Sequence, residues 1–399
     1  MKEIKNEELK KEEEFSQRSR HHQDVSIIFY TLLFVVVIIN LFVPNKAYSD
    51  EENRSLKQFP DIKLSAFADG SFFEDFEDYY SDQFLMRNVW IRMKFYTQYV
   101  VGKREFSDVY VGTGDYLLTA PTAPDKDALK GTVDGINTFT ESYPDVNMYT
   151  IIVPDAAAVM KEKLPVGAPV NDQLAEIDSF VKKLDTRIQP VDAAFALRNA
   201  YKTSKRGDLY YHTDHHWTSE GALTVFNTAA PILGLDNSGV AYISHTVTED
   251  FKGTLSSRSG DMRSSDVINV YEPIGTDVIY TVNYPDEGIK TRSMFNREML
   301  EKKDKYTVFF GGNHALVEIE TTADTGRSLL IFKDSYANSF VQFLTPYFDR
   351  IVLIDPRYYY DNVGMAMSSY GVTDVLFLYS ADILFSDTAL ADTLQTAGD

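Results

Sequence analysis

Cysteine is absent from the 399 residues, and this absence removes several kinds of chemistry at once. Without a thiol the chain has no disulfide scaffold, no cysteine nucleophile and no thiolate metal site. Basic segments are also scarce: the net charge is −20, and no Lys/Arg-rich stretch follows residue 60. Because phosphate backbones are bound by concentrated basic surface, we expect no nucleic acid partner. A hydrophobic content of 44% nevertheless supports a substantial core.

One long segment has no charge at all. Val25–Val43 covers 19 uncharged positions, enough for a helix of roughly 28 Å, close to the hydrocarbon thickness of a bilayer. The following Pro44–Asp50 is a poor match to a signal-peptide cleavage site, so an uncleaved transmembrane anchor is favoured over a signal peptide. A buried core helix is the other alternative.

Charges on either side of this segment predict its orientation. Arg18 and Arg20 precede it and only Lys46 follows closely, so the N-terminus is expected in the cytoplasm of a single-pass cell-membrane protein. The expected organisation is then a cytoplasmic tail (1–24), the anchor (25–43), a juxtamembrane linker with helices (44–108) and an extracytoplasmic domain (109–399).

Aromatic residues recur at spacings of three and four from Ser65 to Val101, which predicts one or two amphipathic helices. Core packing is the simple interpretation of this stripe, and a sugar-stacking surface is the alternative. Beyond Val109, short β-rich runs alternate with helical stretches, which favours an α/β domain with a mainly parallel sheet. The expected strands are Asn147–Val153, Ile188–Val191, Val267–Tyr271, Val278–Val282, Thr307–Phe310, Ser328–Phe332, Arg350–Ile354 and Val375–Tyr379; the expected helices are Ala156–Lys163, Asp172–Leu184 and Ala337–Leu344.

The segment His212–Thr218 contains three of the seven histidines and one of the two tryptophans. Asp214 stands two residues before His216 and can orient its imidazole, so a nucleophile from elsewhere would complete a triad. The same histidines and carboxylate also suit zinc or a similar ion. Alternation along an extended segment lets only every second side chain converge, and no H-E-x-x-H helix occurs. A purely structural Asp–His–Trp cluster remains a third interpretation.

A serine in a suitable position follows an apolar strand. Ser335 stands between the predicted strand Ser328–Phe332 and the predicted helix Ala337–Leu344. A serine at such a turn is exposed at the sheet edge, where backbone N–H groups stabilise an oxyanion. The surrounding residues are not G-x-S-x-G, and a helix N-cap is the alternative role for Ser335.

These motifs resemble those of the DHHW protein family, which is similar to the SGNH-hydrolase-like proteins of alginate O-acetylation. The resemblance rests on Asp214–Trp217 and Phe332–Tyr336, and it extends through Glu52–Leu56, Asp82–Asn88 and Ile354–Tyr358. It implies an SGNH-hydrolase-like three-layer α/β sandwich. It also implies that Asp214 is the orienting carboxylate, His216 the general base and Ser335 the nucleophile, with His215 at a variable position.

The chain departs from typical SGNH hydrolases in two respects. Its serine motif comes late and its histidine motif early, which suggests a permuted arrangement, and Lys333 stands where those hydrolases have glycine. An SGNH site uses a glycine and an asparagine as oxyanion donors. Gly312 and Asn313 are therefore candidates beside the Ser335 N–H, with a simple tight turn as the alternative.

Three further side chains are candidates for binding substrate. Arg357 can hold a carboxylate or phosphate, and Tyr358 can stack on a sugar face; both follow the predicted strand Arg350–Ile354. Tyr336 directly follows the candidate nucleophile. A set of exposed tyrosines without a ligand is the alternative for the segment after that strand.

The expected function is that of an O-acetyltransferase or acetylesterase with no cofactor and no metal, acting on a cell-envelope or secreted polysaccharide. The resemblance further implies a membrane-bound O-acyltransferase partner that supplies the acetyl group. The alternative is a non-catalytic polysaccharide-binding or assembly protein with the same fold.

Overall fold

The computed structural model describes residues 2–49, 54–203 and 208–396, so Glu52 and Asn53 of the resemblance lie outside the described residues. The described chain forms two compact units, one of residues 2–49 and 54–93 and the other of residues 94–203 and 208–396. We describe each unit by itself.

The first unit is helical. Helix α1 (Lys2–Phe42) contains the apolar segment His21–Phe42, which is long and apolar enough to cross a membrane by length and composition. In the aromatic region three helices form where one or two were expected, because Gly70 adopts a left-handed conformation (φ 86°) that ends one helix and starts the next. These elements are α2 (Leu64–Asp69), α3 (Ser71–Asp82) and α4 (Arg87–Val100), with a short pair β1 (Tyr48–Ser49) and β2 (Arg54–Ser55). The boundary between the two units falls within α4, after Met93.

The second unit is built on an eight-stranded sheet in the order β11-β10-β12-β14-β13-β15-β6-β7. Five neighbouring strands, β14 to β7 in that order, run parallel, and the remaining three pair antiparallel. The strands are β6 (Asn147–Val153), β7 (Ile188–Val191), β10 (Tyr280–Tyr284), β11 (Ile289–Thr291), β12 (Leu316–Thr321), β13 (Ser328–Lys333), β14 (Arg350–Ile354) and β15 (Asp374–Ser380).

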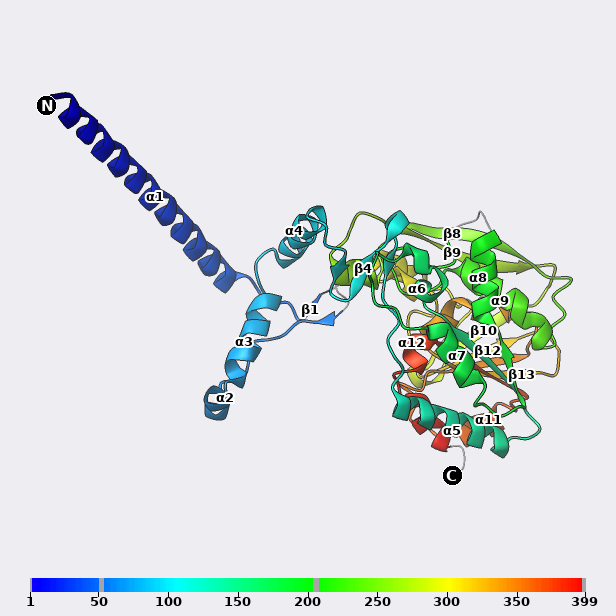
Figure 1. Cartoon of the computed structure of the whole chain (residues 1–399). Helices are drawn as coiled ribbons and strands as arrows, with labels where there is room; N and C mark the ends of the chain where they lie inside the picture. Colours follow the sequence, from blue (N-terminus) through cyan, green and yellow to red (C-terminus); the bar gives the residue numbers. More distant parts are fainter. Residues whose placement is uncertain (1, 50–53, 204–207, 397–399) are drawn as a thin grey trace. The chain divides into compact units, whose positions relative to one another are not determined.

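Both faces of this sheet are covered, because alternate residues of the central strands enter two different hydrophobic clusters. Leu329 and Ile331 of β13 pack on the side of α8 (Ala193–Thr203) and α9 (Ser219–Ile232). Leu330 and Phe332 pack on the opposite side, against helices that include α5 (Lys126–Ser142) and α11 (Val363–Ser369). Figure 1 shows the strands between these helices. Strands buried on both faces are expected for a parallel sheet, and the predicted three-layer α/β fold is confirmed.

The other elements of the second unit connect or extend this sandwich. Two smaller sheets consist of β3-β4-β5 and of the long antiparallel pair β8-β9. The elements are β3 (Glu105–Phe106), β4 (Val109–Val111), β5 (Leu117–Leu118), α6 (Ala156–Val159), α7 (Gln173–Val181), β8 (Ala241–Phe251), α10 (Thr254–Ser259), β9 (Asp266–Ile274), α12 (Ala381–Leu384) and α13 (Ala389–Gln395), with 3₁₀ turns η1 (Thr113–Asp115), η2 (Lys161–Lys163), η3 (Pro285–Glu287), η4 (Arg297–Glu301), η5 (Lys305–Val308), η6 (Ser335–Ser339) and η7 (Val341–Phe343).

The predicted bounds of β6, β7 and β14 are confirmed, whereas two other predictions are wrong. The expected strand Thr307–Phe310 does not form: Thr307 and Val308 end the 3₁₀ turn η5, and only Phe309 makes an isolated bridge, to Phe295. The expected helix Ala337–Leu344 is a pair of 3₁₀ turns, η6 and η7. Short apolar runs such as these do not distinguish a strand from a buried turn by periodicity.

A buried ion pair near the start of β15 gives a test of how this sandwich is held together. Asp374 is fully buried and accepts two bonds from Arg327, at 2.6 and 3.2 Å. Removing one partner of a buried pair leaves an uncompensated charge.

We predict that Arg327→Met lowers the free energy of unfolding by about 3–5 kcal/mol. The matched control is Lys290→Met, which removes the exposed pair with Glu320 (57% and 42% of the side chains exposed) and is expected to cost less than about 1 kcal/mol. Urea unfolding of the purified chain measures both. Equal losses would contradict the structural importance of the buried pair.

Candidate functional site

The segment from Asp208 to Thr218, in the second unit, folds back on itself, and its central residues are held against the start of β9. Tyr210 and Trp217 form an antiparallel bridge, and Tyr211 N donates to His216 O at 3.2 Å. Asp266 at the start of β9 accepts from the backbone N–H groups of His212 and Thr213 at 2.7 and 2.8 Å. The turn that carries Asp214, His215 and His216 is therefore fixed at both ends.

Within this turn the Asp214 carboxylate receives His216. His216 Nδ1 lies 2.6 Å from Asp214 Oδ1, and the His216 backbone N–H donates to the same oxygen at 3.1 Å. The other oxygen, Oδ2, accepts from Thr254 N at 2.8 Å and from Thr254 Oγ1 at 3.0 Å. Burial alone would raise the pKa of Asp214, but the adjacent His215 and His216 and these hydrogen bonds lower it well below its ordinary value.

Gly253 allows the backbone at Thr254 to approach the Asp214 carboxylate closely. A Cβ atom on Gly253 would lie 2.2 Å from Asp214 Cβ, so no larger residue fits unless the backbone moves. Gly253 N also donates to Thr213 Oγ1 at 2.9 Å. Gly253 and Thr254 lie where β8 ends and α10 begins, and they are placed directly against Asp214.

Ser335 follows the carboxyl end of the central strand β13 and lies beside His216. His216 Nε2 lies 2.8 Å from Ser335 Oγ, although 119 residues separate them. Asp334 caps the turn after the strand by accepting from Tyr336 N at 2.9 Å, and its other oxygen accepts from Ser380 N at 2.8 Å. The structure thus joins Asp214, His216 and Ser335 in one hydrogen-bonded chain.

Tyr306 completes the surroundings of His216, and the sequence analysis did not single it out. Its ring stacks on the His216 imidazole with centroids 3.9 Å apart and planes 12° apart. Its hydroxyl donates to Ser335 O at 3.0 Å and is 3.2 Å from Ser339 Oγ. Tyr306 lies in the turn η5, a segment in which the sequence showed only an apolar run.

Trp217 and Tyr336 connect the two motifs behind the site. Trp217 is fully buried, and its Nε1 donates to Tyr336 O at 2.9 Å. Tyr336 is buried as well, and its hydroxyl donates to the backbone carbonyl of His215. The side chain of Tyr336, a candidate for binding substrate, is thus engaged in holding the histidine segment.

His215 differs from His216 in exposure and partners. Its side chain is 42% exposed, and its Nδ1 lies 2.9 Å from Thr254 Oγ1 and 3.4 Å from Asp214 Oδ1. Partial desolvation, with the neighbouring His216, lowers the pKa of His215 to about 4. This imidazole is therefore neutral at pH 7.

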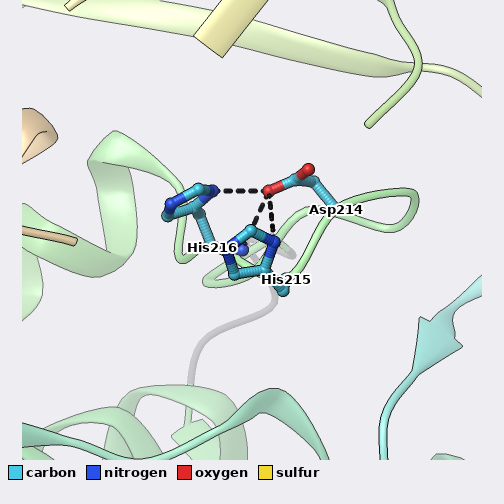
Figure 2. A group of neighbouring side chains, drawn as sticks. All are labelled: Asp214, His215 and His216. Atoms are coloured by element: carbon cyan, nitrogen blue, oxygen red, sulfur yellow. Dashed lines mark hydrogen bonds and ion pairs between the residues drawn. The ribbon is translucent and has the colours of Figure 1, made fainter. Parts of the chain in front are cut away.

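The ligand atoms of Asp214, His215 and His216 lie within 4.8 Å of one another, which by distance alone suits a metal ion. Figure 2 shows both imidazoles directed at the carboxylate. Each Nδ1 faces Asp214 Oδ1, and Oδ2 is occupied by Thr254. These polar atoms are therefore engaged with one another and with Thr254, and metal binding would require breaking these interactions.

Asn313, one of the oxyanion candidates, lies in a polar network centred on Lys333. Asn313 Oδ1 accepts from Asn338 Nδ2 at 3.1 Å and lies 3.4 Å from Lys333 Nζ. Lys333 is buried, donates to Asn338 Oδ1 at 2.9 Å and lies 3.5 Å from Asp355 Oδ2. Burial lowers its pKa, while Asp355 opposes the shift. Gly312 has φ 129°, a value that favours glycine.

Arg357 and Tyr358 follow β14, the parallel neighbour of β13, so both lie at the strand edge that carries Ser335. Arg357 makes a two-point ion pair with the buried Asp355, at 2.8 and 2.7 Å. Its guanidinium also lies 5.5 Å from the Tyr358 ring centroid. Among the described residues, no direct hydrogen bond joins Arg357, Tyr358, Gly312 or Asn313 to Ser335 or His216.

Two solved structures share the fold of this chain, and a third matches it with a lower score. A DHHW family protein from Eubacterium siraeum is 25% identical over 71% of this chain and 93% of its own, with a TM-score of 0.59. Bacillus cereus PatB1 is 18% identical over 70% and 98%, also with a TM-score of 0.59. The O-acetyltransferase domain of Pseudomonas putida AlgJ is 14% identical over 72% and 99%, with a TM-score of 0.46.

Sequence comparison places the chain in a family. A search of curated proteins gives no match. The family described as DHHW protein matches residues 146–354, slightly more than half of the chain, and this region includes both the histidine turn and Ser335. The chain belongs to the DHHW protein family.

Proposed function

We propose that this protein is a membrane-anchored, extracytoplasmic O-acetyltransferase, or an acetylesterase, that modifies a cell-envelope or secreted polysaccharide. One observation carries the proposal: the continuous chain from Asp214 Oδ1 to His216 and on to Ser335 Oγ, with separations of 2.6 and 2.8 Å. This is the geometry that a nucleophile, its base and an orienting carboxylate require. The resemblance of both motifs to those of acetylation proteins directs the proposal to acetyl transfer.

In the proposed first step, His216 Nε2 takes the proton of Ser335 Oγ as the oxygen attacks the carbonyl carbon of an acetyl ester. Asp214 stabilises the imidazolium that forms. When the tetrahedral intermediate collapses, the bond to the leaving oxygen breaks, and His216 returns the proton to that oxygen. The acetyl group is then an ester on Ser335.

In the second step the acceptor hydroxyl of a sugar gives its proton to His216 and attacks the serine ester. The acetyl group passes to the sugar, and the proton returns to Ser335 Oγ. Water in place of the sugar makes the same site an esterase, so exclusion of water from the acyl-enzyme determines the outcome.

The remaining roles are assigned by position. The Ser335 N–H is the first oxyanion donor, with Gly312 and Asn313 as further candidates. Arg357 and Tyr358 are proposed to bind the polysaccharide from the neighbouring strand end, and Tyr336 to border the site. The segment 1–24 is proposed as a cytoplasmic tail, 25–43 as the anchor, 44–108 as the connection and 109–399 as the catalytic domain. A membrane-bound O-acyltransferase is the proposed acetyl donor partner.

The nucleophile can be tested by trapping the acyl-enzyme. Incubation of the full chain in detergent with an activated acetyl ester is expected to add about 42 Da to the protein, as an ester on a serine requires. Intact-mass spectrometry measures the adduct, and Ser335→Ala is expected to show none. The nucleophile assignment fails if the wild type and Ser335→Ala behave alike.

The two adjacent histidines provide a matched pair of variants. His216→Ala is expected to slow acylation by at least about 10³-fold, because the base is lost. His215→Ala is expected to cost less than about tenfold, because His215 is the more distant of the two from Asp214 and binds Thr254 instead. Mass spectrometry of samples quenched at successive times measures both acylation rates. Equal decreases in rate for the two variants would argue against His216 as the base.

Tyr306 allows its ring and its hydroxyl to be examined separately. Tyr306→Phe keeps the stacked ring and removes one buried hydrogen-bond donor, so acylation is expected to slow by about three- to tenfold. Tyr306→Leu also removes the ring that favours the imidazolium, and a further loss of about tenfold is expected. Acylation rates at saturating ester measure the effect of each variant. Identical rates for Tyr306→Phe and Tyr306→Leu would exclude a contribution from the ring.

A further inference from the structure

The His215 ring is held in place and yet remains open to solvent. Its side chain is 42% exposed, in contrast to the buried His216. The backbone carbonyl of His215 accepts a hydrogen bond from the Tyr336 hydroxyl. At the other end of the residue, Nδ1 lies 2.9 Å from Thr254 Oγ1 and 3.4 Å from Asp214 Oδ1. Because these contacts already fix the ring, a ligand that binds to it immobilises little further.

The partners of Nδ1 determine which ring nitrogen of His215 carries the proton. The lowered pKa of Asp214 keeps its carboxylate ionised, so both of its oxygens only accept hydrogen bonds. Thr254 Oγ1 has one proton, which it donates to Asp214 Oδ2 at 3.0 Å. The same hydroxyl oxygen therefore accepts from His215 Nδ1, which also faces Asp214 Oδ1. With its proton on Nδ1, the neutral imidazole has a lone pair on Nε2.

This lone pair belongs to a ring that lies directly beside the reacting pair. Figure 2 shows both imidazoles with Nδ1 directed at Asp214, so each Nε2 is farther from the carboxylate. The ring centroids of His215 and His216 are 3.9 Å apart, and His216 Nε2 lies 2.8 Å from Ser335 Oγ. No residue in the described part of the chain forms a hydrogen bond with His215 Nε2. The atom is therefore available to a ligand.

A neutral nitrogen lone pair selects a ligand that has a hydrogen-bond donor. A carboxylate has only acceptor oxygens and is opposed by this lone pair, whereas a sugar hydroxyl can donate to it. The hydroxyl that attacks the Ser335 ester is not this donor, because its proton passes to His216. A second hydroxyl, on the neighbouring carbon of the same sugar, can fill the role. Two adjacent imidazoles thus match two adjacent hydroxyls.

We propose that His215 selects the acceptor: its Nε2 binds the hydroxyl next to the one that attacks the acetyl ester of Ser335. This inference rests on the proposed function and assigns His215 to its second step. The attacking hydroxyl gives its proton to His216 and forms the new ester bond as the bond to Ser335 Oγ breaks. The proton then returns to that oxygen, and the neighbouring hydroxyl keeps its own proton. The contact favours a vicinal diol over an isolated hydroxyl or a water molecule.

Two isomeric alcohols can test this selection without knowledge of the polysaccharide. The full chain in detergent is acylated with p-nitrophenyl acetate in the presence of trans-cyclohexanediol. This diol is either the vicinal isomer or the isomer whose hydroxyls lie on opposite carbons of the ring, so only the spacing of the hydroxyls differs. We expect the wild type to acetylate the vicinal isomer about tenfold faster, because one further hydrogen bond holds it. Gas chromatography of the monoacetates measures both rates.

Variants of His215 assign the selection to its ring. His215→Ala is expected to reduce the preference to less than about twofold, while acylation itself slows by less than about tenfold. His215→Gln offers an amide oxygen as a substitute acceptor and is expected to restore a preference of at least about threefold. The Gln variant also decides the result if His215→Ala acylates too slowly. His245→Ala removes an exposed histidine that pairs with Glu272; it is the matched control and is expected to keep the full preference.

The outcomes separate this inference from the proposed function. If the wild type gains no acetyl group on Ser335, the proposed function fails and the inference fails with it. If Ser335 is acetylated but the two isomers react equally, or neither reacts, the inference alone is overturned. It is also overturned if His215→Ala keeps the wild-type preference, because the selection then lies in other residues.

Discussion

The buried charge of Asp214 is the constraint on which the arrangement of the site depends. A carboxylate removed from water must be compensated by hydrogen bonds and by nearby groups that bear or accept positive charge. Asp214 obtains them from the backbone and ring of His216 and from both donors of Thr254. These partners come from two segments about 40 residues apart, so satisfying one carboxylate brings the segments together.

Trp217 has a different role, because it connects the histidine turn to the segment that carries Ser335. Trp217 makes no contact with the Asp214 carboxylate among the described interactions; its ring nitrogen instead binds the carbonyl of Tyr336, next to Ser335. The Tyr336 hydroxyl in turn donates to the backbone carbonyl of His215. The two bonds run in opposite directions between the motifs, and they limit how far His216 and Ser335 can separate. The Asp-His-His-Trp motif therefore also has a structural role, which is to limit the distance between His216 and Ser335.

The sequence allowed prediction of those parts of the site that lie in regular or clustered patterns. The strands β6, β7 and β14 have strong β-rich runs, and the histidine turn and Ser335 are found from residue type and spacing. Tyr306 and Gly253 could not be found in this way. Tyr306 lies in an irregular turn whose position depends on tertiary packing, and Gly253 matters only because Asp214 occupies the space that its Cβ would need. Lys333 was identified from the sequence only because typical SGNH hydrolases have glycine at this position. Its interactions with Asn338 and Asp355 could not be predicted, because these partners come together only when β13 and β14 pair.

The order of strands has a consequence for biosynthesis. Strand β6 pairs with β7 on one side, but its other neighbour is β15, which lies 227 residues later in the chain. Until that last strand has been synthesised, the inner edge of β6 has no partner, and β13 lacks a neighbour on the same side. Pairing over such sequence distances is slow, and open strand edges invite association with other chains. The sheet therefore closes only after β15 has left the ribosome, and the edges of β6 and β13 stay open until then.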